Sequence, residues 1–212
     1  MALSKIQPAS MDLTANYAFT GTNSVAGLEY AEKKLATLTA SSSSTLSFTS
    51  NIDSTYNIYK FRFIEIHPSH NSNVDFGFQG STNTGSSYGV TLTSTFFDAY
   101  HYENDSSAAV RYLTSRDLAQ STSFQPLSVN TAEADADQHV SGELFLFDPS
   151  STTFVKHFIS TTQTASDGGS DDFSDNAYIA GYFNTTSAID AIQFKFPSGN
   201  IDSGTIEMYG IN

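Results

Sequence analysis

The chain has 212 residues, of which 22 are Asp or Glu and nine are Lys or Arg, so its formal net charge is −13. Nucleic acids and anionic membranes bind proteins through clustered Lys and Arg, and this charge balance argues against both as partners. The sequence contains no cysteine, which excludes disulfides, thiolate metal ligands and cysteine nucleophiles. The N-terminus lacks the apolar segment of a secretory signal and no run is long enough to span a membrane, so we expect synthesis in a cytoplasm.

Hydroxyl groups rather than ions supply most of the polarity. Ser and Thr fill about a quarter of the positions, whereas charged residues make up 15% and aromatic residues 13%. This composition is too aromatic for a disordered chain, and it favours strands and turns over helices. The cations are scattered along the chain, and only Lys33 with Lys34 and Lys60 with Arg62 form close pairs.

The first half of the chain predicts an arm followed by strands. Residues 1–29 mix small and polar residues with isolated apolar ones, and we expect an arm or first strand that contacts a neighbouring subunit. A period of two, typical of strands, begins after them. In chain order the expected elements are a short helix at 28–34, strands at 34–39 and 45–49, a strand apolar on both faces at 56–66, and strands at 73–79 and 110–114.

The second half continues the pattern with turn residues between the strands. Segments that are apolar on both faces indicate central strands, buried from both sides or covered by a neighbouring subunit. Residues 161–175 are too hydrophilic to pack and predict a loop. In chain order the expected elements are short helices at 115–120 and 131–137, a central strand at 142–147, strands at 153–160 and, again central, 178–183, and final strands at 192–196 and 203–211.

Two short motifs are compatible with catalysis or metal binding. Residues 85–89 match G-x-S-x-G, the nucleophile elbow of hydrolases, but that motif acts at a strand-to-helix turn and here a strand-forming segment follows. His67, His70, His101 and Glu103 offer metal ligands without the convergent spacing of a zinc site. We interpret both as surface loops, and an esterase or polysaccharide depolymerase acting through Ser87 is the enzymatic alternative.

Two acidic clusters are interpreted as solvated loops, because neither has the spacing of a known calcium-binding loop. They comprise Glu133, Asp135 and Asp137, and Asp167, Asp171, Asp172 and Asp175. No glycine signature of a nucleotide-binding site is present, and we predict no cofactor.

Tyrosines are the residues that favour glycan binding, because sugar rings stack on aromatic side chains. The candidates are Tyr88, Tyr100 and Tyr102 in the middle of the chain. Packing in the core or between subunits is the alternative interpretation of these side chains.

Several segments of the sequence resemble virion structural proteins of tailed bacteriophages, particularly marine phages. The resemblance lies in residues 3–22 (LSKIQPASMDLTANYAFTGT), 44–69, 141–151 (SGELFLFDPSS) and 188–211 (AIDAIQFKFPSGNIDSGTIEMYGI). It implies a virion-exposed β-sandwich subunit, either a capsid decoration or a tail-fibre-like protein, and it carries no catalytic residue.

We therefore predict an all-β protein, with residues 30–212 forming one antiparallel, jelly-roll-like β-sandwich that contains only short helical turns. The predicted function is non-enzymatic: a phage virion surface protein that self-associates, by analogy as a trimer, and binds other virion proteins such as the capsid or tail. The alternative is a receptor-binding tip that recognises a host surface glycan.

Overall fold

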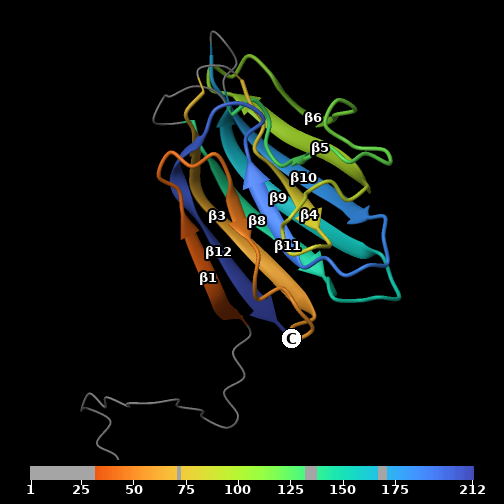
Figure 1. The fold of residues 1–212 in the computed structure, drawn as a ribbon. Coiled ribbons are helices and arrows are strands. Elements are labelled where there is room, and N and C mark those ends of the chain that lie inside the picture. The colour runs from red at the N-terminus through yellow and green to blue at the C-terminus, as the bar shows by residue number, and fades with distance from the viewer. Residues whose placement is uncertain (1–31, 71–72, 132–137, 167–170) are drawn as a thin grey trace, which may run out of the picture. The chain divides into compact units, whose positions relative to one another are not determined.

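Twelve β-strands and no helix form in the part of the chain that the structure describes (Figure 1). This computed structural model describes residues 32–70, 73–131, 138–166 and 171–212, and the predicted arm at residues 1–29 lies outside them. The strands are β1 Lys33–Thr39, β2 Leu46–Phe48, β3 Ile58–Pro68, β4 Gly77–Ser81, β5 Leu92–Tyr102, β6 Ala108–Tyr112, β7 Gln125–Pro126, β8 Val140–Phe147, β9 Lys156–Ser166, β10 Phe173–Phe183, β11 Ala191–Lys195 and β12 Ile201–Ile211.

The strands form two antiparallel sheets, as expected for a β-sandwich. The order in the eight-stranded sheet is β1-β12-β3-β8-β9-β10-β5-β6, and the order in the four-stranded sheet is β2-β11-β4-β7. The fold class predicted from the sequence is confirmed, and the jelly-roll connectivity stays a prediction. The segments that are apolar on both faces became β3, β8 and β10, each of which has a neighbour on either side in the larger sheet, as predicted.

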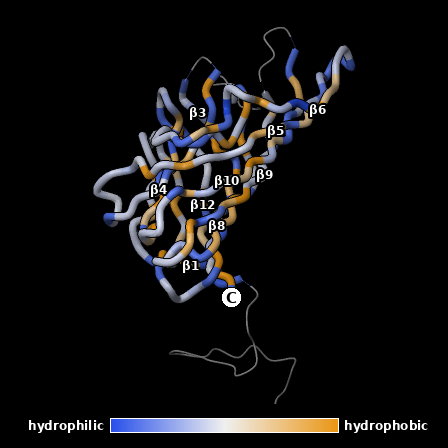
Figure 2. Tube along the Cα trace, turned by 90° about the vertical axis from the view of Figure 1, so that its right-hand side faces the viewer, coloured by the Kyte–Doolittle hydropathy of each residue, from blue (hydrophilic) through white to orange (hydrophobic). Residues whose placement is uncertain are grey.

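Phenylalanine rings fill the space between the two sheets. Phe194 of β11 lies 5.4 Å from Phe61 and 5.3 Å from Phe63 of β3, measured between ring centroids. Further along the sandwich, Phe78 of β4 lies 5.0 Å from Phe158 of β9 in an edge-to-face contact. These contacts join the sheets face to face, and Figure 2 shows hydrophobic and more polar residues following one another along the strands.

The described ends of the polar stretch 161–175, residues 161–166 and 171–175, pack, contrary to the prediction of a loop. Its ends belong to β9 and β10, and the side chains of Thr162, Thr164 and Ser166 are buried. The Thr162 hydroxyl donates to the carbonyl oxygen of Leu127, and the Ser166 hydroxyl donates to that of Val129 at 2.6 Å. A hydroxyl that bonds a backbone carbonyl satisfies both groups, so this strand can turn polar side chains inward.

The predicted helices are wrong wherever the structure describes them. Residues 115–120 form turns that continue from β6, where the amides of Arg116 and Asp117 donate to the carbonyl oxygen of Leu113. The described end of the segment 28–34 enters strand β1. Of the segment 131–137 only Thr131 is described, and it pairs with Val74 in a β-bridge.

Two strands were not predicted in full: of β5 only the first residues were described as strand-forming, and the two-residue β7 was missed. β5 is central in the larger sheet, but its sequence brings Asp98 to the buried face and Phe97 to the outer face. This reversal removes the alternation of hydropathy on which the strand prediction depends.

Two Ser-Gly pairs, Ser141-Gly142 on β8 and Ser203-Gly204 on β12, lie on either side of an irregularity in β3. The pairing of β3 with both β8 and β12 shifts register near Glu65, which has a φ of 51°. A Cβ at Gly204 would lie 2.4 Å from the carbonyl oxygen of Glu65, and the Ser141 hydroxyl accepts a hydrogen bond from the Glu65 amide at 3.1 Å. Glycine is therefore required at 204 because the neighbouring backbone approaches it closely.

Candidate functional site

The structure brings together only two of the three tyrosines proposed for glycan contact, Tyr100 and Tyr102, whose ring centroids lie 5.8 Å apart. Tyr88 lines one cavity with Ser87 and Asn184, whereas Tyr102 lines another with His139. Tyr100 packs within the fold, since the guanidinium of Arg111 lies 4.1 Å from its ring centroid and its hydroxyl bonds that of Ser107 at 3.0 Å.

The G-x-S-x-G segment lies in a loop that leads into a strand. The hydroxyl of Ser87 accepts a hydrogen bond from the Asn83 amide at 3.0 Å, and strand β5 follows at Leu92. Because no helix follows Ser87, the loop lacks the geometry of a nucleophile elbow.

The candidate metal ligands are dispersed across the described structure. His101 lies 3.0 Å from Asp105, whereas His67 belongs to β3 and His70 follows that strand. Within residues 32–70, 73–131, 138–166 and 171–212, no three His, Asp or Glu side chains group closely enough to hold a metal ion. The acidic residues 133, 135, 137 and 167 lie outside the described ranges.

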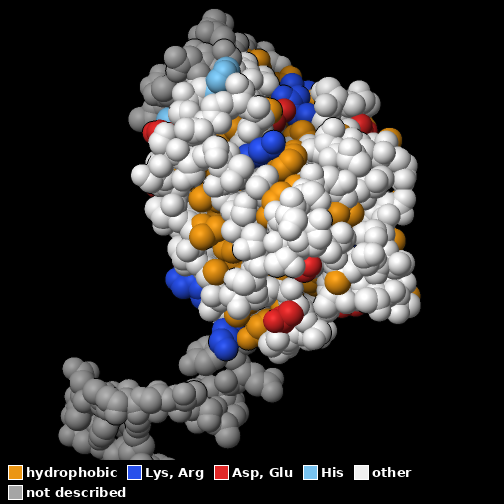
Figure 3. Space-filling view, viewed as in Figure 1, with side chains coloured by type: hydrophobic (Ala, Val, Ile, Leu, Met, Phe, Trp, Pro, Cys, Tyr) orange, Lys and Arg blue, Asp and Glu red, His pale blue; other side chains and the backbone are white. Residues whose placement is uncertain are grey.

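Two cations that are far apart in the sequence line one cavity beside the four-stranded sheet. Arg116 and Lys195 border a cavity of about 490 Å³ together with Phe124, Pro126 and Asn130. The sequence placed both among scattered cations, and the structure brings them together. Figure 3 shows Lys and Arg side chains beside hydrophobic ones over this sheet. We refer to this feature as the cationic cavity.

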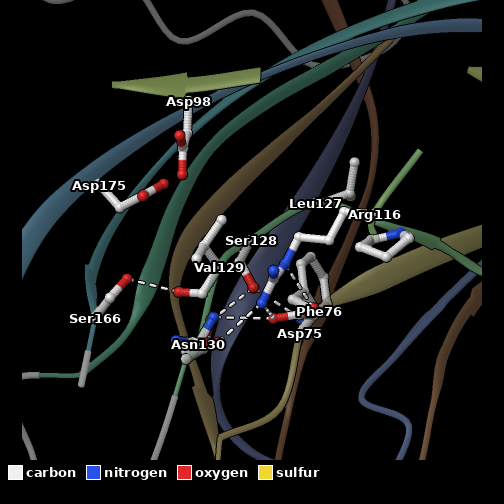
Figure 4. Close-up of polar contacts among 12 residues, drawn as sticks. Asp75, Phe76, Asp98, Arg116, Leu127, Ser128, Val129, Asn130, Ser166 and Asp175 are labelled. Atoms are coloured by element: carbon white, nitrogen blue, oxygen red, sulfur yellow. Dashed lines mark hydrogen bonds and ion pairs between the residues drawn. The ribbon is translucent and has the colours of Figure 1, made fainter. Parts of the chain in front are cut away.

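Arg116 is held in place by a network of polar groups (Figure 4). Its Nε lies 2.9 Å from Asp75 Oδ2, while its Nη2 donates to Asp75 Oδ1 at 3.1 Å and to Asn130 Oδ1 at 2.8 Å. Asp75 Oδ1 also accepts from the Asn130 amide at 2.9 Å, and the side chain of Gln125 donates to the Arg116 carbonyl oxygen at 3.0 Å. The guanidinium is therefore fixed before any ligand arrives.

Lys195 projects from the end of β11 over an aromatic ring. Its Nζ lies 4.2 Å from the centroid of Phe124, a cation–π contact. No carboxylate of the described residues lies within ion-pair distance of this ammonium group. The cavity thus combines one cation that is already paired, Arg116, with one that is not.

A buried pair of carboxyl groups lies on the inner face of the eight-stranded sheet. Asp98 and Asp175 are both fully buried, and Figure 4 shows their carboxyl groups facing each other. Arg111 donates to Asp98 from Nε at 3.0 Å and from Nη2 at 2.5 Å, whereas its Nη2 is 3.5 Å from Asp175. Burial, followed by hydrogen bonding to the neighbouring Asp98 and the charge of that residue, raises the pKa of Asp175 to about 8. Asp175 therefore carries a proton at neutral pH, and the guanidinium of Arg111 lies closer to Asp98 than to Asp175. The interpretation of Asp175 as part of a solvated acidic loop is wrong.

The outer face of the eight-stranded sheet divides into a charged half and an uncharged half. On the charged half, Lys60 pairs with Glu32, and Lys34 lies 3.0 Å from Glu207. On the other half, Phe97 and Tyr178 stack at 5.0 Å with an interplanar angle of 9°.

We call the second half the uncharged face: the outward side chains of β9, β10, β5 and β6. None of them is Asp, Glu, Lys or Arg. They are His157, Ile159, Thr161, Gln163 and Ala165 on β9, Ser174, Asn176, Tyr178, Ala180 and Tyr182 on β10, Thr93, Thr95, Phe97, Ala99 and His101 on β5, and Ala108, Val110 and Tyr112 on β6.

Comparison with known proteins gives no relative: no protein-family model matches the chain, and neither a curated protein nor a solved structure is similar to it. In the described residues there is also no helix with the length and hydropathy of a membrane span. The features above are therefore interpreted from their chemistry alone.

Proposed function

We propose that this protein is a non-enzymatic structural subunit of a bacteriophage virion surface, of the capsid-decoration or fibre type, that associates with copies of itself through the uncharged face. The observation that carries the self-association is this face. A chain with a net charge of −13 has four adjacent strands whose outward side chains include no Asp, Glu, Lys or Arg.

Several of the most exposed side chains on this face are large and apolar, and they lie among Thr, Ser, Asn and Gln side chains. Val110 is 74% exposed, Tyr112 54% and Ile159 50%, and Phe97 and Tyr178 lie between them in the sheet. Contiguous apolar surface of this kind marks interaction sites in soluble proteins. Its burial would release water without desolvating an Asp, Glu, Lys or Arg of the four strands, and the nearest carboxylates lie at its border, where Tyr112 donates to Asp117 and His101 lies 3.0 Å from Asp105.

The dimensions of the uncharged face suit a protein partner. Three of its strands have 11 residues, and strands about 4.8 Å apart with a rise of about 3.3 Å per residue give a footprint of roughly 600 Å². A standard interface buries about 800 Å² per partner, so this face supplies most of one.

The free edge of the sheet favours a second copy as that partner. β6 is the last strand, and its backbone groups on the far side have no neighbouring strand among the described residues. Arg111 points inward to Asp98, so the exposed edge carries Val110 and Tyr112 without an outward charge to oppose pairing. Pairing of β6 with a sister chain would extend both the sheet and the uncharged face.

The virion location is supported by the phage-like segments at both ends of the sequence. It is also compatible with a chain that uses no cysteine. By analogy with other capsid decorations and spikes, we expect a trimer.

Sedimentation equilibrium of the full chain, combined with light scattering, tests the self-association. We expect an oligomer for the parent protein and a monomer for Phe97→Glu, because each copy of the variant would bury a carboxylate in the interface. Phe154→Glu is the matched control: Phe154 is 70% exposed but lies in the loop between β8 and β9. A monomeric parent, or equal effects of both variants, would overturn the proposal, and absence of the chain from purified particles by mass spectrometry would overturn the virion assignment.

A further inference from the structure

The cationic cavity has the size and the lining of a small-molecule site. Its volume of about 490 Å³ falls within the usual range of ligand pockets, about 300–1,000 Å³. Phe124, Pro126 and Pro197 supply apolar surface, and Asn73, Ser123 and Asn130 supply amide and hydroxyl groups. This mixture of flat apolar walls and neutral polar groups suits a ligand that has both C–H faces and hydroxyls.

The charges in the cavity favour an anion. Arg116 and Asp75 compensate each other, and Lys195 adds a positive charge without an ionic partner among the described residues. The remaining charge at the cavity is therefore positive, although the whole chain is strongly negative. A ligand with one carboxylate would neutralise it.

The cationic groups are also positioned in advance. Asp75 and Asn130 fix the guanidinium of Arg116, and the ring of Phe124 supports the Lys195 ammonium at 4.2 Å. Groups that are already ordered lose little conformational entropy on binding, so a small ligand can be held by few contacts.

We propose that the cationic cavity binds a carboxylated sugar, such as a hexuronic acid or a sialic acid unit of a surface polysaccharide. The carboxylate pairs with Lys195 beside Arg116, the ring lies against the apolar wall, and its hydroxyls bond Asn73, Ser123 or Asn130. The site lies beside the four-stranded sheet, on the opposite side of the sandwich from the uncharged face, so the inference does not depend on self-association.

The test is titration of the full chain with the sodium salts of glucuronic acid and N-acetylneuraminic acid and with their short oligosaccharides, followed by calorimetry and by amide chemical shifts. Glucose and N-acetylglucosamine are the neutral counterparts. We expect binding of at least one acidic sugar that weakens as salt is added, with no binding of the neutral sugars.

The variant Lys195→Met keeps an unbranched side chain over Phe124 but removes the charge. We expect it to weaken binding about tenfold or more, since a charge-assisted hydrogen bond is lost. Lys33→Met is the matched control, because Lys33 is exposed on β1 of the other sheet, and Lys195→Arg should retain affinity. Three results would each overturn the proposal. They are binding of the neutral sugars with equal affinity, tighter binding of a peptide with a free C-terminal carboxylate, and no binding of any acidic sugar at concentrations of about 10 mM.

Discussion

The buried proton on Asp175 makes a specific prediction about stability and pH. The pKa of this carboxyl group is raised from its ordinary value of 3.8 to about 8 in the folded protein, chiefly by burial. At pH values between 3.8 and about 8, Asp175 has lost its proton in the unfolded chain but keeps it in the folded chain. The stabilising contribution is therefore complete below the unfolded pKa, and it is lost as the pH rises toward the folded pKa.

The magnitude follows from the linkage between proton binding and folding. In this window each pH unit removes about 1.4 kcal/mol of folding free energy through Asp175. In Asp175→Asn the amide replaces the protonated carboxyl group, can still donate to Asp98, and does not titrate. From pH 5.5 to pH 7.5 we expect the variant to gain about 3 kcal/mol relative to the parent protein. This is a large part of the stability of a typical domain, about 5–15 kcal/mol.

The measurement is urea unfolding of both proteins at several pH values, read as the difference between their free energies of unfolding. Taking the difference cancels the contributions of carboxylates remote from Asp175, including Asp53 and Glu207, whose lowered pKa values act in the opposite direction. Asp202→Asn is the control for the loss of one exposed carboxylate, because Asp202 is exposed on β12. If the free-energy difference between Asp175→Asn and the parent protein does not change with pH, Asp175 is ionised in the folded state and the assignment of the proton is wrong.

Three further substitutions test the packing. Gly142→Ala should lower stability by about 3 kcal/mol, because its Cβ would lie 2.3 Å from the Thr161 carbonyl oxygen. Gly89→Ala is the control, because Gly89 has the same φ of 158° but a Cβ there would have its nearest neighbour at 3.9 Å. In thermal unfolding we expect Gly89→Ala to lower stability far less than Gly142→Ala, and equal losses would contradict the steric argument. Phe194→Ala should cost about 3–5 kcal/mol in denaturant unfolding, since its ring joins the two sheets, and a loss below about 1 kcal/mol would refute that role.

The strands that could be predicted from the sequence are those in which hydropathy and burial coincide. In β11, Ile192 and Phe194 face the core while Gln193 and Lys195 face outward, and the period of two identifies the strand directly. In β9 the inward residues include Thr162 and Ser166, whose hydroxyls bond backbone carbonyls of a loop that is remote in sequence. Hydropathy cannot reveal such partners, because they exist only once the chain has folded.

The candidate sites could be predicted from the sequence only in part. The expectation that apolar strand faces meet sister subunits is compatible with the uncharged face, but its extent depends on β5, a strand that the sequence analysis did not predict in full. The cationic cavity could not be predicted, because Arg116 lies in a loop after β6 and Lys195 ends β11, and these segments meet at one cavity only in the folded chain.

The two proposals use opposite sides of the sandwich, and this separation is itself testable. Phe97→Glu changes the outer face of the larger sheet, whereas Lys195→Met changes a cavity beside the smaller one, and the phenylalanine core lies between them. Effects at sites with no shared partners are usually additive. We therefore expect the Phe97→Glu monomer to bind the acidic sugar with unchanged affinity, and Lys195→Met to retain the oligomeric state of the parent. If Lys195→Met instead dissociates the oligomer, the cationic cavity receives a carboxylate from a sister chain and is part of the interface.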